Sequence, residues 1–256
     1  CRTAENRTQT SRTRSVYTTT ILQSDNFLIE YIIILMFTQE VRFYLYLILA
    51  VGILSASFHG LGLVKGAPLQ IFYSDVLGFF EKAVEPGFPY LTKNIEYPVL
   101  TGLFIELAGF LGGNRSVYYF FSVIFLLIFA LGTTYFLYRL LPEENKNSLL
   151  KYWILAPSFL FFLTYNWDII PILFTGIAFY LVKNNNEEFA IPHIRENKGY
   201  KENRTLAAAV FLALGASAKL YPIFYLPVLI LKAKDWAERM KITSVFGLTF
   251  LAVNLP

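Results

Sequence analysis

Four acidic residues in one mixed polar and apolar segment are candidates for acid–base chemistry. They are Asp75, Glu81, Glu85 and Glu96. A carboxylate beside a substrate hydroxyl can remove its proton, and a well-placed general base accelerates a reaction by about 10²–10⁴-fold. Each of the four also fits an ordinary exposed loop or the polar face of an amphipathic helix. Residue type and spacing alone therefore do not separate them.

Two other segments place a lone charged residue inside a long apolar run. Asn166, Trp167 and Asp168 bring together an amide, an indole and a carboxylate, which suit the hydroxyls and ring faces of sugars. Lys219 precedes Leu-Tyr-Pro, where the proline interrupts a helix, and its ammonium group suits a phosphate. A charge at membrane depth costs roughly 2.5–3.5 kcal/mol on insertion scales, so it tends to face water or a partner. The simpler interpretation is that Asp168 and Lys219 cap short hairpins at the membrane surface.

The composition indicates that membrane helices hold these residues in place. Hydrophobic residues make up 55% of the chain and charged residues 16%, whereas soluble domains carry about 25% charged residues. Residues 43–63 and 116–138 are uncharged runs long enough to cross a bilayer as helices, with His59 the one titratable group in the first. These features exclude a soluble enzyme, a nucleic-acid-binding module and a disordered tail. They predict an all-α, polytopic bundle of transmembrane helices.

Several further elements follow from the apolar pattern. We expect an amphipathic helix over residues 70–84 and an apolar helix over residues 97–113. Residues 152–182 and 205–231 form two more apolar blocks, each interrupted only by Asp168 or Lys219. Each block is long for one span and short for two. We therefore predict two hairpins with the lone charge at the apex of each.

The basic residues predict the orientation of these spans. Twelve of them lie in three short loops: Arg139, Lys146, Lys151, Lys183, Arg195, Lys198, Lys201, Arg204, Lys232, Lys234, Arg239 and Lys241. Loops rich in Lys and Arg stay in the cytoplasm, which places Asp75, Asp168 and Lys219 on the extracytoplasmic face. This arrangement needs an even number of crossings between residues 61 and 114. Either residues 97–113 enter the membrane without crossing it, or residues 70–84 cross it as well.

We expect the membrane domain to carry an extension at its N-terminus and to lack residues at its C-terminus. Residues 1–35 are rich in Thr, Arg and Ser, and Met36 precedes the first apolar span, so we expect residues 1–35 to be a non-native or disordered extension. The alternative is a basic, partly amphipathic segment with an interfacial helix over residues 27–37. The apolar run from Ile242 to Pro256 suggests that the membrane domain, residues 36–256, is incomplete at its C-terminus.

Four segments, in order, carry a family resemblance. They are YSDVLGFFEKAVEPGFPYLTKNIEYPVLTGLF, NWDIIPILFTGIAFYLVK, GASAKLYPIFYLPVLIL and VNLP. Over roughly residues 40–256 the chain resembles the polyprenol-phosphate-mannose-dependent membrane mannosyltransferases, which are multi-spanning glycosyltransferases of the GT-C architecture, here of the alpha-1,2-mannosyltransferase type. The chain departs from the family at Tyr97-Pro98-Val99, where relatives carry Tyr-Pro-Pro.

The resemblance implies a reaction and roles for individual residues. A sugar, mannose in the family, moves with inversion from a polyprenyl-phosphate donor to a hydroxyl of a glycan or glycolipid, on the outer face of the cell membrane. Asp75 matches the catalytic loop aspartate of the family and would be the general base. The candidate substrate-binding residues are Lys219 for the phosphate, Asn166, Trp167 and Asp168 for the sugar, and Tyr73, Tyr90, Tyr97 and Tyr221 as neighbouring aromatic side chains.

Other interpretations stay open at this point. Asp75 and Asp168 could share a divalent ion, although we expect no metal cofactor because the resembled enzymes generally require none. The one cysteine and the two distant histidines exclude an internal disulfide and a CxxC site, and disfavour a histidine metal site. A flippase or secondary transporter for lipid-linked sugars would also use interrupted helices and membrane charges. A structural subunit of a membrane complex is the third possibility. No internal repeat is visible, which argues against a transporter.

Overall fold

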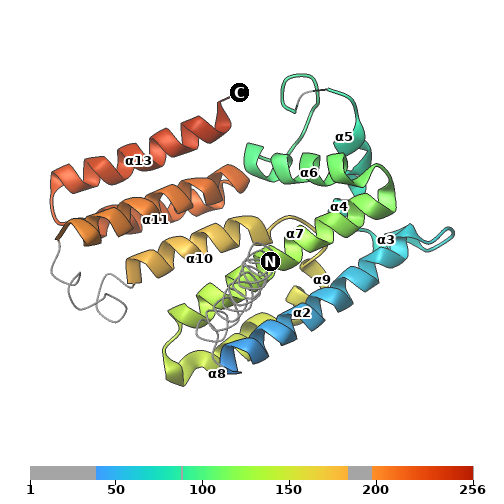
Figure 1. Ribbon diagram of the computed structural model, residues 1–256, viewed down its shortest axis with the longest axis horizontal. Coiled ribbons are helices and arrows are strands. Elements are labelled where there is room, and N and C mark those ends of the chain that lie inside the picture. Colours follow the sequence, from blue (N-terminus) through green and yellow to red (C-terminus); the bar gives the residue numbers. More distant parts are fainter. Residues whose placement is uncertain (1–38, 88, 184–197, 256) are drawn as a thin grey trace, which may run out of the picture. The chain divides into compact units, whose positions relative to one another are not determined.

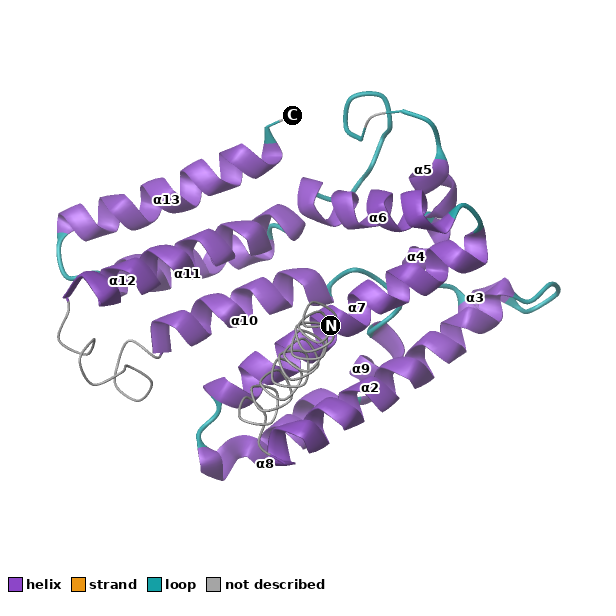
Figure 2. Cartoon of the chain, in the orientation of Figure 1, coloured by secondary structure: helices purple, strands orange, loops and turns teal. Residues whose placement is uncertain are grey.

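The computed structural model describes residues 39–87, 89–183 and 198–255, so the predicted extension over residues 1–35 lies outside it. Residues 44–256 form one compact unit, and a second unit, residues 1–43, contributes only residues 39–43 to the described part. Every regular element in the described part is a helix (Figure 2). The all-α class predicted from the sequence is therefore confirmed.

Two helices are long and apolar enough to cross a membrane, and they correspond to the two predicted spans. Helix α2, Gln39–Gly60, continues into a short 3-10 turn, Leu61–Leu63. Helix α7, Arg115–Leu140, starts where the Asn114 side chain accepts a hydrogen bond from the Val117 amide, at 3.1 Å. This length and composition support association with a membrane.

The predicted single helix over residues 70–84 is wrong. Three short helices replace it: α3, Leu69–Phe72; α4, Asp75–Gly78; and α5, Phe80–Val84. The break before α4 arises at Ser74, whose backbone is extended and whose Oγ accepts a hydrogen bond from the Leu77 amide at 3.2 Å. Serine competes with the helix in this way because its hydroxyl satisfies an unpaired amide at a helix start. Asp75 therefore occupies the first position of a new helix.

The remaining long helices pack side by side in the order α7, α10, α11 and α13, with α6 against α7 (Figure 1). Their bounds are Val99–Gly112 for α6, Ile169–Lys183 for α10, Lys198–Ala218 for α11 and Trp236–Asn254 for α13. Small side chains of α11, Ala208, Ala209, Ala213 and Ala216, are fully buried. Small residues allow helices to approach closely, which is how apolar helices associate without a large hydrophobic driving force.

Both apolar blocks are divided into helices that change direction near their lone charge. Helix α8, Lys146–Leu149, precedes the first block, which runs from a π-helical turn, Leu150–Ile154, through α9, Pro157–Phe162, and continues after Asp168 as α10. The second runs along α11 and returns through a 3-10 turn, Tyr221–Tyr225, and α12, Leu226–Lys232. Asp168 and Lys219 lie in the two turns.

Hydrogen bonds define two opposite ends of the helix packing. At one end, Thr101 at the start of α6 donates to the carbonyl oxygen of Ala218 at 2.8 Å, which places the N-terminus of α6 beside the turn that holds Lys219. We call this the site end. At the other end, Lys183 Nζ donates to the Leu140 carbonyl oxygen at 2.6 Å, which joins the C-termini of α10 and α7. Because several of the predicted cytoplasmic lysines and arginines lie here, we call it the basic end.

Candidate functional site

The site centres on Asp75, which the short helix α4 presents at the site end. The Val76 amide donates a hydrogen bond to the Tyr165 carbonyl oxygen at 3.2 Å, and the rings of Tyr73 and Tyr165 lie 5.9 Å apart. These contacts dock α4 onto the turn between α9 and α10. As a result, Asp75 lies next to the segment that contains Asn166 and Asp168, more than ninety positions away in the sequence.

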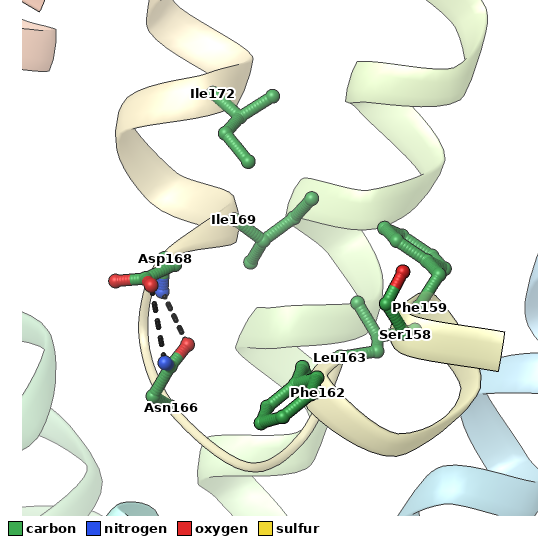
Figure 3. A pocket seen from close by; sticks show the side chains of 8 residues that line it. All are labelled: Ser158, Phe159, Phe162, Leu163, Asn166, Asp168, Ile169 and Ile172. Carbon is green, nitrogen blue, oxygen red and sulfur yellow. Dashed lines mark hydrogen bonds between the residues drawn. The ribbon is translucent and has the colours of Figure 1, made fainter. Parts of the chain in front are cut away.

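Asp168 is the centre of a polar cluster on that turn. Asn166 Nδ2 donates to Asp168 Oδ2 at 3.1 Å, and the Asp168 amide donates to Asn166 Oδ1 at 3.0 Å (Figure 3). Lys219 forms an ion pair with Asp168 Oδ1 across the two hairpin turns. About two fifths of each side chain of the pair stays exposed, so its net stabilisation is that of a screened pair. Nothing in the sequence predicted that these two charges pair with each other.

Tyr97 connects the two parts of the site. Burial, followed by the negative charges of Asp75 and Asp168, raises the pKa of the Tyr97 hydroxyl above its ordinary value. Burial and a hydrogen bond to Asp75 also raise the pKa of Tyr73. Both phenols therefore stay protonated at neutral pH and act as donors toward the Asp75 carboxylate. Asp75 itself forms no ion pair within the described residues.

The loop that carries Tyr97 is held by residues that the sequence reasoning missed. Lys93 Nζ lies 2.8 and 2.9 Å from the two carboxylate oxygens of Glu106 on α6 and donates to the Ala83 carbonyl oxygen at 3.2 Å. The Lys93 side chain is 4% exposed. Glu106 is the one charged residue of the apolar helix α6, as Asp168 and Lys219 are in their apolar blocks. The same sequence pattern could therefore have identified it.

Tyr90 forms the second anchor of this loop. Its hydroxyl donates to the Tyr97 carbonyl oxygen at 3.0 Å, and its backbone adopts a positive φ of 65°. Gly102 makes room for the ring, because a Cβ at that position would lie 1.7 Å from the Tyr90 hydroxyl oxygen. Burial, and next the charge of Glu106, raise the pKa of Tyr90 to about 12, so the phenol keeps its proton.

The other predicted aromatic residues have different surroundings. Trp167 is 1% exposed, and its indole nitrogen has no hydrogen-bond partner in the described part of the chain. This burial corrects the expectation that Trp167 offers a ring face to a sugar, because the ring packs inside the protein. Tyr221 begins the turn after Lys219 and lies near the charge of Asp168. Tyr73 is about half exposed, and it is the most open phenol of the site.

A cavity of about 360 Å³ lies beside the polar cluster. Its apolar walls come from α9 and α10, including Phe159, Phe162 and Ile172, while Asn166 and Asp168 form a polar side (Figure 3). An apolar slot with one polar edge suits a molecule that joins an apolar chain to a polar group. No group of three or more His, Cys, Asp or Glu side chains in the described ranges is placed to hold a metal ion.

Comparisons of the chain with protein-family models, curated proteins and solved structures gave no match. The geometry of the residues and the sequence resemblance therefore carry any functional proposal.

Proposed function

We propose that the protein is a polytopic membrane glycosyltransferase that moves a sugar, mannose by the resemblance, from a polyprenyl-phosphate donor to an acceptor hydroxyl of a glycan or glycolipid. The supporting observation is the convergence of Asp75, Tyr97 and the Asp168–Lys219 pair at the site end, although they come from four separate segments. The reaction needs a base for the acceptor and a cation for the phosphate, and Asp75 and the partly exposed Lys219 are the candidates for these two roles.

The proposed step is a direct displacement. Asp75 takes the proton of the acceptor hydroxyl as that oxygen bonds to the anomeric carbon, and the bond between this carbon and the phosphate oxygen breaks, which inverts the configuration. Lys219 donates to the departing phosphate, because its ammonium group has three donors and Asp168 occupies only one. Tyr73 and Tyr97 orient the carboxylate. The cavity next to Asp168 would receive the donor where its apolar chain meets the phosphate.

The proposed orientation follows from the two ends of the helix packing. The basic end lies in the cytoplasm by the positive-inside tendency, so the site end faces the outside. Helix α6 has 14 residues and spans about 21 Å, less than the hydrocarbon core of about 30 Å. In the proposed topology it enters from the outside without crossing, because its N-terminus lies at the site end and its C-terminus leads into the start of α7, which is also outside; α3, α4 and α5 do not cross either. This keeps the number of crossings between residues 61 and 114 even.

The orientation can be tested by cysteine labelling of the chain after Cys1→Ser. We expect Leu91→Cys to react with a membrane-impermeant maleimide from the outside, and Lys234→Cys to react only from the cytoplasmic side. Labelling of both positions from the same side would contradict the proposed topology.

The reaction itself can be tested in proteoliposomes with a radiolabelled sugar. The whole protein should transfer mannose from polyprenyl-phosphate mannose to a mannoside acceptor, and should not use a nucleotide sugar. If the donor instead crosses the bilayer without any transfer, the protein is a flippase and the proposal is wrong. The absence of both transfer and transport would favour a structural subunit.

A further inference from the structure

A second cavity lies at the basic end, far along the helices from Asp75. It has a volume of about 370 Å³ and is formed where the C-terminal parts of α7, α10 and α12 meet. Leu140, Phe179 and Val228 contribute apolar walls, and Lys183 and Lys232 complete the lining. No acidic side chain is among its lining residues. Among the described residues, the lining therefore combines an apolar interior with two positive charges and no negative one.

The two lysines keep most of their hydrogen-bonding capacity. Lys183 uses one donor for the Leu140 carbonyl oxygen, at 2.6 Å. Lys232 forms no hydrogen bond or ion pair with the residues that the structure describes. A lysine in the last turn of a helix also interacts favourably with the helix dipole, which accounts for the residue type at both positions. The ammonium groups of Lys183 and Lys232 therefore each keep at least two N–H groups for a ligand.

An apolar stripe of exposed side chains continues from the cavity along the 3-10 turn and α12, which contact α11. Its members are Phe224, 79% exposed, Val228, 42% exposed, and Leu231, 76% exposed. Val228 and Leu231 are three residues apart on α12 and so share one helical face, and Phe224 lies in the 3-10 turn that leads into α12. Because Val228 also lines the cavity, the stripe continues the apolar wall outward. Large exposed apolar side chains in such an array mark contact with lipid or with a partner.

We propose that this cavity binds the phosphate group of an anionic phospholipid, with Lys183 and Lys232 as its cationic ligands and an acyl chain along the stripe. A zwitterionic lipid brings its own cation, which two lysines disfavour where the described lining has no acidic side chain. Basic pockets between membrane helices bind anionic head groups for the same reason. The proposal requires that the chain lies in a bilayer and does not depend on the proposed sugar transfer.

The test is native mass spectrometry of the full chain in detergent, titrated with phosphatidylglycerol or phosphatidylcholine. We expect phosphatidylglycerol to bind several-fold more tightly. Lys232→Ala should weaken phosphatidylglycerol binding by about fivefold, the effect of one lysine near a lipid phosphate. The matched control is Lys234→Ala, which removes the same charge from an exposed position outside the cavity and should leave binding within about twofold.

Two further arms identify the occupant. Val228→Phe fills the apolar wall without changing charge and should weaken binding of phosphatidylglycerol. Glycerol 3-phosphate, which carries the phosphate without acyl chains, should not displace the lipid at equal concentration. Equal binding of the two lipids, equal losses in Lys232→Ala and Lys234→Ala, or full competition by glycerol 3-phosphate would each overturn the proposal. The last outcome would show a site for free phosphate instead.

Discussion

The ion pair between Lys93 and Glu106 should decide whether the loop that carries Tyr97 stays in place. Replacing Lys93 by Met keeps much of the side-chain volume but removes the contacts to Glu106 and to the Ala83 carbonyl oxygen. The Glu106 carboxylate would then remain near the protein interior, 19% exposed, without its cation. Removing one member of a buried pair costs about 3–5 kcal/mol. We expect about 3 kcal/mol here, because Glu106 keeps some contact with solvent.

Hydrogen exchange measured by mass spectrometry on the peptide covering residues 85–98 reports the opening of this loop. A cost of about 3 kcal/mol corresponds to roughly 10²-fold faster exchange in Lys93→Met, provided that exchange follows the opening equilibrium. Sugar transfer should fall in the same variant, because Tyr97 would no longer be held beside Asp75. The double variant Lys93→Met with Glu106→Gln should recover most of the protection, since no uncompensated charge is left.

The same loop offers a matched control. Lys82 pairs with Glu96 at 2.6 Å, but these side chains are 39% and 70% exposed. An exposed pair contributes about 0.2–1 kcal/mol, so Lys82→Met should accelerate exchange by no more than about fivefold. If Lys82→Met and Lys93→Met open the loop equally, burial is not what makes the Lys93–Glu106 pair important. A double variant as open as Lys93→Met would likewise refute the reasoning from an uncompensated charge.

Three further results are expected from the site itself. Asp75→Asn should lower turnover by about 10² or more with little change in donor binding, whereas Glu81→Gln, at an exposed position of α5, should be near neutral; steady-state transfer rates and donor titrations check both. Lys219→Ala should weaken donor binding, seen as a raised KM for polyprenyl-phosphate mannose, because its ammonium group contacts phosphate before and during the reaction. Asp168→Asn should lower the melting temperature only slightly in differential scanning fluorimetry, since a partly exposed pair contributes about 1 kcal/mol or less, and a large drop in melting temperature would show that the pair is structural.

The apolar pattern determined the helical elements of this protein. Uncharged runs over residues 43–63 and 116–138 gave α2 and α7 within a few residues, because an apolar run of that length has few folded alternatives to a helix. The positions of the lone charges Asp168 and Lys219 predicted the two turns between helices, because a charge is least costly where the backbone leaves the apolar interior. Residue type and position in the sequence also indicated Asp75, Asp168 and Lys219 as candidate site residues.

Only the tertiary structure decided which of these residues meet. The pairing of Asp168 with Lys219, the hydrogen bond from Val76 to Tyr165 and the burial of Trp167 depend on contacts between distant segments. Local sequence patterns carry no information on such contacts. The division of residues 70–84 into three helices depends on the Ser74 cap competing with helical periodicity. The buried Lys93–Glu106 pair joins a loop to α6 and so was not visible as a pair in either segment alone. Periodicity and composition act within a segment, whereas the geometry of the site arises from the packing of four segments against one another.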